Sequence, residues 1–283
     1  MPGNNGRHHQ FKKNFKKERP LIDENNPVLK AFQAYAIELD AKHDRYERIV
    51  KMSRDITIES KRIIFLLHSI DIRKNNKQKV LDEAQTRLEK VITYNFKAIA
   101  EELHDHDPYQ FRGAYSPGLQ EFIEAYTFME YIKYVENEED SNQGEMIDWN
   151  GLQKKMTYPS GEDNADHSNS VEKFFFVDPN EYILGVSDLT GELMRRCINS
   201  LGSGETDTCL SCCKALQKFY TGYFSINVRR CRELSRKIYT MRQSVLKAEN
   251  VCYNVKVRGG EAAKWGAMFD GKSNGDDIDE GFF

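Results

Sequence analysis

The chain has 283 residues, with 41 Lys and Arg against 44 Asp and Glu, so its formal net charge is −3. Hydrophobic residues make up 39% and charged residues 30%, which allows a sizeable core beneath a very polar surface. Gly (18) and Pro (7) are sparse, which disfavours a turn-rich sandwich or barrel and favours long helices. The longest apolar runs are too short to cross a bilayer, and no apolar stretch follows the basic N-terminus as a secretory signal requires, so we expect an intracellular protein.

The first 26 residues predict a disordered basic arm. Residues 1–20 carry six Lys and Arg against one Glu, a local charge of +5, among Asn, Gly and His. This composition fits a nuclear import signal, an electrostatic tether for nucleic acid, or a solubilising tail. We therefore expect the protein in the cytoplasm and the nucleus. The residues that would form the import signal are Lys12, Lys13, Lys16, Lys17 and Arg19.

Residues 27–260 predict a single all-α domain. From Pro27 to position 70 there is no further Pro and no Gly, and apolar residues recur at alternating steps of three and four. This pattern predicts one very long amphipathic helix that begins at Pro27. The next helices are expected over about 77–103 and about 117–135. In the second of these, Ser116 is read as the cap and Pro117 as the first helical residue.

Residues 136–170 carry nine acidic residues against two Lys, with Gly, Ser and Asn between them, which predicts a long, partly disordered acidic loop. It separates two helical halves but is not read as a domain boundary, because each half alone would leave apolar stripes uncovered. The following helix opens with Asp178-Pro179, and Glu181 stands at the capping-box position. Helices are then expected over about 179–201, 208–220 and 229–257, with the last ending at Gly259-Gly260 before an acidic tail over 261–283.

Six cysteines lie in the second half of the chain, and two of them, Cys209 and Cys212, form a C-x-x-C pair. No second pair and no His pair follows at zinc-finger spacing, and nothing points to an oxidising compartment. Plain thiols are therefore the preferred interpretation, ahead of structural zinc.

Two pairs of acids differ in their surroundings from the many acidic pairs that lie among Lys and Arg. Glu121 and Glu124 flank an apolar helix stripe and share their side of the helix with aromatic residues. Asp188 and Glu192 lie along one edge of another stripe, followed one turn later by Arg195. Two glycines within that second helix, Gly185 and Gly191, suggest close approach by a neighbour or a ligand, because Gly destabilises a helix by about 1 kcal/mol relative to Ala.

If the two helices lie side by side, these four carboxylates meet, and an all-oxygen set of this kind selects Mg²⁺ or Mn²⁺. A metal would relieve the repulsion between the carboxylates and lower the pKa of a bound water. The alternative is two edge pairs that form salt bridges with neighbours such as Arg195. A redox-active di-iron bundle is disfavoured, because no His follows either pair at the spacing that such bundles use.

At these residues the chain resembles the translin family, in particular its translin-associated factors. The resemblance covers most of residues 27–260 and rests on four segments. They are ELDAKHDRYERIVKMSRDITIESKRIIFLLH (38–68), GLQEFIEAYTF (118–128), YILGVSDLTGELMRRCINSLG (182–202) and KIYTMRQSVLKAENVCYNVKVRG (237–259).

The resemblance implies an elongated seven-helix bundle and a hetero-octamer with translin that encloses a basic interior. It also implies Mg²⁺-dependent cleavage of single-stranded or nicked RNA, including passenger-strand fragments, which promotes activation of Argonaute in RNA interference. The family's metal-binding catalytic acids lie in the motifs QE-x-x-EA and DLTGEL. In this sequence they correspond to Glu121, Glu124, Asp188 and Glu192.

The residues that contact RNA are less sharply indicated. Arg195 either clamps a phosphate or pairs with Glu192, and Lys61 and Arg62 either line a basic groove or lie on a solvated helix face. The basic run from Arg229 to Lys237 has the same two interpretations. The alternative function is a non-catalytic scaffold that binds RNA or single-stranded DNA as a partner of translin, and the first helix would dock that partner.

Overall fold

The computed structural model describes residues 26–135, 148–159, 173–226 and 231–270. The chain divides into two compact units, Met1–Asp44 and Arg45–Phe283. The basic arm, its five predicted import-signal residues and the end of the acidic tail lie outside the described residues. In the first unit the described part is the beginning of helix α1 (Pro27–Leu67), where the rings of Phe32 and Tyr35 meet edge to face with centroids 6.1 Å apart.

The second unit is helical, which confirms the all-α fold class. After α1 the helical run 77–103 is continuous, and its three parts are α2 (Lys77–Lys90), a π-helical stretch η2 (Val91–Phe96) and α3 (Lys97–Leu103). If this run is counted as one helix, the described residues hold seven α-helices. The others, besides α1, are α4 (Arg112–Glu130), α5 (Trp149–Lys155), α6 (Pro179–Gly202), α7 (Thr206–Phe224) and α8 (Arg232–Asp270).

Shorter elements complete this unit. They are the 3₁₀ turns η1 (Ile72–Lys74) and η3 (Pro108–Phe111), the π-helical end η4 (Tyr131–Val135), and strands β1 (Thr157–Tyr158) and β2 (Lys173–Phe174). The two strands pair antiparallel, with Thr157 opposite Phe174. None of the described helices is both long enough and apolar enough to cross a membrane.

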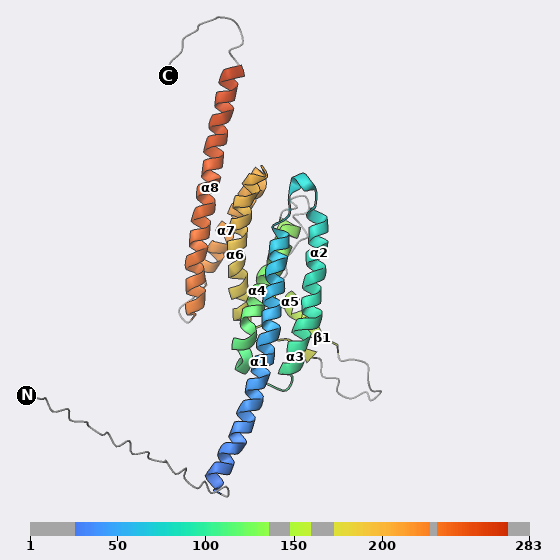
Figure 1. Ribbon diagram of the computed structural model, residues 1–283. Helices are drawn as coiled ribbons and strands as arrows, with labels where there is room; N and C mark the ends of the chain where they lie inside the picture. Colours follow the sequence, from blue (N-terminus) through green and yellow to red (C-terminus); the bar gives the residue numbers. More distant parts are fainter. Residues whose placement is uncertain (1–25, 136–147, 160–172, 227–230, 271–283) are drawn as a thin grey trace, which may run out of the picture. The chain divides into compact units, whose positions relative to one another are not determined.

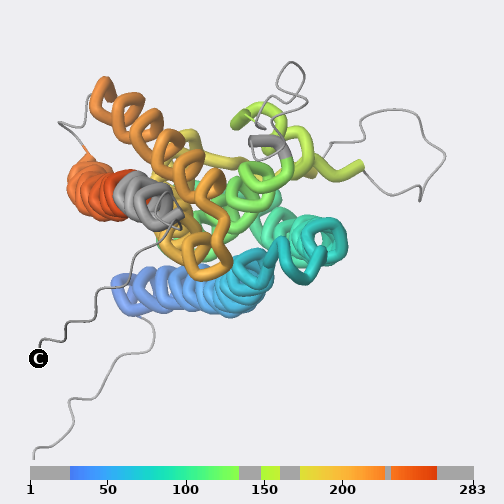
Figure 2. Tube along the Cα trace, turned by 90° about the horizontal axis from the view of Figure 1, so that it is seen from above, coloured from blue at the N-terminus to red at the C-terminus, as the bar shows by residue number. Residues whose placement is uncertain are grey.

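Helix α6 is the element through which the second unit packs. It lies against α4 on one side and against α7 and α8 on the other (Figure 1). The view from above shows α4, in green, surrounded by other helices of the unit (Figure 2). At Gly185 a Cβ atom would lie 2.7 Å from Ile123 Cβ and 3.0 Å from the Gln120 carbonyl, so α4 and α6 approach closely there. The close approach predicted for Gly185 is therefore observed, whereas at Gly191 a Cβ would meet nothing within 4 Å.

The start of α4 differs from the prediction. The helix begins at Arg112, so Pro117 lies inside it rather than at its first position. A proline there removes one helical hydrogen bond. In the same turn α1 makes two contacts with α4: Gly118 N–H donates to Ser53 Oγ at 3.1 Å, and Ser53 Oγ donates to the Tyr115 carbonyl at 3.4 Å. The position of Pro117 within the helix was not predictable from local sequence, because this turn packs against another helix.

Two other boundary predictions were wrong. Within the predicted acidic loop, residues 149–155 form α5 and residues 157–158 form β1, because Leu152, Met156 and Tyr158 are buried against the core. Helix α8 does not stop at Gly259-Gly260 but continues to Asp270. Asp178 does cap α6, since its side chain accepts from the Asn180 N–H.

The role predicted for Glu181 in a capping box at this end of α6 is also wrong. Its carboxylate faces α4 instead, where Arg112 Nε and Ser116 Oγ each lie 2.5 Å from it.

Candidate metal centre

Helices α4 and α6 bring together the four acids singled out in the sequence. Glu121 and Glu124 stand on α4, and Asp188 and Glu192 stand on α6. None of the four is fully solvated, because the exposed fraction of the side chain is 26% for Glu121, 35% for Asp188 and 12% for Glu192. We call these four side chains the carboxylate cluster.

Glu124 lies in the most unfavourable environment for a charged carboxylate. Burial raises its pKa to about 8, and the charges of Asp188, Glu121 and Glu192 contribute to the rise. Lys237 lowers this pKa but does not reverse the shift. Because the other three acids all act on Glu124, the cluster is one electrostatic site rather than two separate helix edges.

Basic side chains contact the other three acids. Lys61 Nζ lies 3.1 Å from Glu121, and Lys237 Nζ lies 2.6 Å from Asp188. Burial raises the pKa of Asp188, and its ion pair with Lys237 offsets part of that rise.

Glu192 is held from two sides. His68 Nε2 lies 2.5 Å from Glu192 Oε2, and Arg195 Nη1 lies 3.3 Å from the same oxygen. In the described part of the chain, the Glu124 carboxylate has no hydrogen-bond or ion-pair partner.

A chain of hydrogen bonds connects the cluster to the buried Glu181. Gln120 Nε2 donates to Glu181 at 2.6 Å, while Gln120 Oε1 accepts from Lys237 Nζ at 2.8 Å. Lys237 in turn donates to Asp188 and to the Leu184 carbonyl. Three helices therefore fix the position of one ammonium group beside the acids.

The donor set fits a hard divalent cation. Four carboxylates from two helices supply only oxygen ligands, which suit Mg²⁺ or Mn²⁺. A cation among them would favour the ionised form of Glu124, whose proton is otherwise retained near neutral pH. The carboxylate oxygens of the four acids are not all close enough to one another to coordinate a single ion without side-chain movement. Among the described residues, the only set of three or more His, Cys, Asp or Glu donors whose atoms all lie within 4.8 Å of one another is a group of cysteines.

The basic residues predicted to bind RNA divide into two groups. Lys61 and Arg195 lie at the carboxylate cluster, each paired with one of its acids. Arg62 pairs instead with Glu59, 3.7 Å away, and does not contact the cluster. Arg229 and Arg230 lie outside the described residues.

Sequence reasoning missed His68 and the role of Lys237. His68 follows the end of α1 and packs on Phe128 with ring centroids 4.9 Å apart, which directs its Nε2 toward Glu192. Lys237 was read as part of a basic run, although its side chain is largely buried against α4 and α6. The sequence around either residue does not indicate its role, because the acid that it contacts is at least 49 positions away in sequence.

The arrangement of helices agrees with the comparison of the chain with known proteins. Residues 44–259 match the Translin family. The chain belongs to the translin family. It is 40% identical over 267 residues to Translin-associated protein X of Pongo abelii, a match that covers 91% of this chain and 88% of that protein. It is 39% identical over 268 residues to the Mus musculus protein of the same name, with the same shares covered.

More distant family members and solved structures extend this result. The Translin-associated protein X homolog of Schizosaccharomyces pombe is 26% identical over 230 residues, covering 80% of this chain and 87% of that protein. The crystal structure of apo-NeC3PO matches with a TM-score of 0.55 and 19% identity, over 80% of this chain and 96% of that one. The AfC3PO–duplex RNA complex matches with a TM-score of 0.54 and 18% identity, over 81% and 97%. At these identities the structures establish the helical fold alone.

Proposed function

We propose that this member of the translin family is the catalytic subunit of a metal-dependent endoribonuclease that assembles with translin. The proposal is carried by Glu124, a buried carboxyl with a pKa of about 8 that results from burial and from three other acids converging on it. Strongly perturbed acids that share one site are typical of functional centres, since packing alone gives no reason to assemble them. Relatives named for association with translin, and a similar fold seen with duplex RNA, support the partner and the substrate.

The resident ion would be Mg²⁺, or Mn²⁺ in its place, held by Glu121, Glu124, Asp188 and Glu192. When bound, such an ion supplies positive charge for the phosphate and acidifies a bound water. The chain's own residues then have distinct roles. Glu124 must lose its proton for all four acids to act as ligands, and Lys237 holds Asp188 at 2.6 Å in a fixed orientation.

Basic residues beside the cluster are placed to bind the RNA backbone. Arg195 is more than half exposed while it touches Glu192, so its guanidinium can reach solvent and a phosphate. A polar cavity of about 250 Å³ adjoins His68, and its lining includes Arg73, Lys74 and Arg196 together with Asp71 and Glu205. Cationic groups that line a path to the acids would hold the phosphodiester backbone with little dependence on base sequence.

The test is RNA cleavage by the complex of this chain with translin, in the presence of Mg²⁺ or EDTA. The variant Glu121→Gln removes one charge from the carboxylate cluster while preserving size. The matched control is Glu130→Gln, which changes a buried carboxyl on the same helix whose raised pKa arises from burial and not from the four acids. We expect Mg²⁺-dependent cleavage by the wild type and the control and its loss in Glu121→Gln. Equal cleavage by all three proteins would reject the role of Glu121.

A scaffold without catalysis is the second candidate, and one observation favours it. Three of the four acids already pair with Lys61, Lys237, His68 or Arg195, as salt bridges that only stabilise the helices would. The two functions can be distinguished by the effect of removing and restoring divalent ions. A scaffold assembles with translin and retains RNA in EDTA but cleaves nothing when Mg²⁺ is restored. The nuclease loses cleavage in EDTA and regains it.

A further inference from the structure

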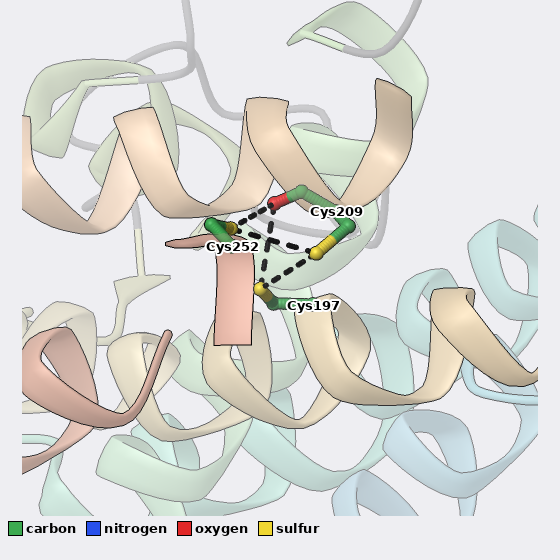
Figure 3. Close-up of side chains that lie close together, drawn as sticks. All are labelled: Cys197, Cys209 and Cys252. Atoms are coloured by element: carbon green, nitrogen blue, oxygen red, sulfur yellow. Dashed lines mark hydrogen bonds between the residues drawn. The ribbon is translucent and has the colours of Figure 1, made fainter. Parts of the chain in front are cut away.

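Three cysteines from three helices meet on the other side of α6. Cys197 stands on α6, Cys209 on α7 and Cys252 on α8, and their side chains converge on one point (Figure 3). The Sγ atom of Cys209 lies 3.5 Å from that of Cys197 and 3.6 Å from that of Cys252, and all three sulfurs lie within 4.8 Å of one another. We call these three side chains the thiol cluster.

We propose that the thiol cluster is a binding site for one thiophilic d¹⁰ metal ion, Zn²⁺ or Cu⁺, that links α6, α7 and α8. The site is separate from the carboxylate cluster and does not depend on the proposed nuclease function. Its ligands come from tertiary packing, since the C-x-x-C partner of Cys209 does not join them. Cys212 instead accepts a hydrogen bond from the Tyr131 hydroxyl at 3.6 Å.

The sulfur spacing matches that of metal-bound thiolates. Two sulfurs that each lie about 2.3 Å from a zinc ion at the tetrahedral angle are roughly 3.8 Å apart. The observed separations of 3.5 and 3.6 Å differ from this value by only a few tenths of an ångström, so the ion requires little movement of the helices. A single sulfur donor would not suffice, but three at this spacing form most of a coordination sphere.

A fourth donor lies beside the sulfurs. The backbone carbonyl oxygen of Cys209 is 3.4 Å from Cys197 Sγ and 3.7 Å from Cys252 Sγ, and Figure 3 shows it among the three sulfurs. Three sulfurs and one oxygen supply four donors, which is the coordination number of structural Zn²⁺ sites. Three sulfurs alone would suit Cu⁺, whereas a hard cation such as Mg²⁺ is disfavoured by sulfur ligands.

The three cysteines are shielded from solvent, since Cys197 and Cys209 are fully buried and Cys252 is 7% exposed. Each thiol that becomes a ligand gives its proton to solvent, so the uptake of one Zn²⁺ exchanges up to three protons and no electrons. Zinc leaves the set of three thiolates with a net charge of −1, and copper(I) leaves it with −2.

The test is metal binding by the full chain, prepared reduced and metal-free in its complex with translin. Cobalt(II) is the probe, because its thiolate complexes give a charge-transfer band in the near ultraviolet that carboxylate ligands do not produce. We expect one cobalt ion per chain with this band, its displacement by Zn²⁺, and tighter binding at higher pH. In a second arm, Cu⁺ competes against a Cu⁺-specific chelator and identifies copper(I) as the ion if it binds and cobalt does not.

Variants locate the site. Cys209→Ser is expected to abolish the band, and Cys252→Ser is expected to weaken binding by more than the roughly 10- to 100-fold loss typical of an outer-shell change. The matched control is Cys231→Ser, which alters a half-buried cysteine that is not part of the cluster. Circular dichroism checks that each variant is folded. If Cys209→Ser does not fold, the result for Cys252→Ser decides the test.

Three outcomes would overturn the proposal. They are the absence of binding with both cobalt and copper(I), an unchanged band in the folded Cys252→Ser protein, and a mass that shows a disulfide between two of the three cysteines in the protein freshly isolated without reductant.

Discussion

The carboxylate cluster and the thiol cluster share helix α6 but lie on opposite sides of it, and burial affects them differently. At the carboxylate cluster three acids keep basic partners, and burial together with the charges of these acids raises the pKa of the fourth, Glu124, to about 8. At the thiol cluster the side chains donate weak hydrogen bonds to one another and to a carbonyl. The carboxylates come together despite the electrostatic repulsion between them, whereas the thiols pack without such repulsion. A carboxyl whose pKa is raised partly by other acids supports the proposed catalytic site, whereas the convergence of three thiols supports the proposed site for a thiophilic ion.

The largest difference between the two clusters is expected in catalysis. Asp188→Asn removes a charged ligand from the carboxylate cluster and also breaks the ion pair with Lys237. We expect RNA cleavage by the translin complex to fall by about 100-fold or more, because ligand charge determines how the ion is held. Cys197→Ser, in the next part of the same helix, is expected to retain cleavage within a few-fold. Equal losses in the two variants would show that the clusters are not independent.

The next effect concerns stability against pH. The unfolded carboxyl of Glu124 titrates near 4.5 and the folded one near 8, so the folded chain keeps a proton that the unfolded chain has lost. The free energy of unfolding therefore falls as pH rises through this window. Glu124→Gln removes the titration, so the metal-free variant should gain stability over the wild type between pH 5 and pH 8, on the order of 4 kcal/mol. Urea denaturation in EDTA measures this difference. A constant difference across that range would contradict the assignment.

A smaller effect on the free energy of unfolding is expected to distinguish the two glycines of α6. At Gly185 an added methyl group would press on Ile123 and the Gln120 carbonyl, so Gly185→Ala is expected to lower the free energy of unfolding by about 1–3 kcal/mol. At Gly191 an added methyl meets nothing within 4 Å, so Gly191→Ala should stabilise the protein by up to about 1 kcal/mol. Thermal denaturation of the pair tests the packing of α4 on α6. A destabilised Gly191→Ala protein would indicate a neighbour at that position.

The smallest effect is expected at the rim of the carboxylate cluster. Arg195→Gln removes an exposed charge that neutralises one phosphate in the proposed complex. RNA binding should weaken modestly, and the slope of log affinity against log salt should decrease by about 1. Arg62→Gln is the control, because Arg62 pairs with Glu59 away from the acids. An unchanged slope in Arg195→Gln would show that Arg195 pairs with Glu192 and does not contact an RNA phosphate.

The sequence predicted the parts of the fold that depend on local periodicity. The 41-residue helix α1 and the continuous run 77–103 follow apolar residues at steps of three and four, and both are observed. The predicted start of α4 was wrong because the turn that contains Pro117 packs on another helix, where Ser53 accepts a hydrogen bond from the Gly118 amide. Helix α5 was missed because it holds a few buried residues within an acidic stretch.

The difference between local patterns and contacts between distant segments also applies to the two clusters. Glu121, Glu124, Asp188 and Glu192 were predictable because their aromatic and apolar neighbours lie on the same helix. Their partners His68 and Lys237 were not, because they arrive from distant segments. The thiol cluster was missed for the same reason. The C-x-x-C spacing drew attention to Cys212, which bonds Tyr131, while the true neighbours of Cys209 lie 12 and 43 positions away.

The hydrogen bond between Ser53 and the Gly118 amide also limits how α1 and α4 can slide past each other. A Cβ at Gly118 would lie 2.6 Å from the Ser53 carbonyl oxygen, so the two backbones fit only in this one alignment. A shift by a single turn would break this hydrogen bond and would move Lys61 away from Glu121. The contact between Gly118 and Ser53 thereby favours one register between the two helices.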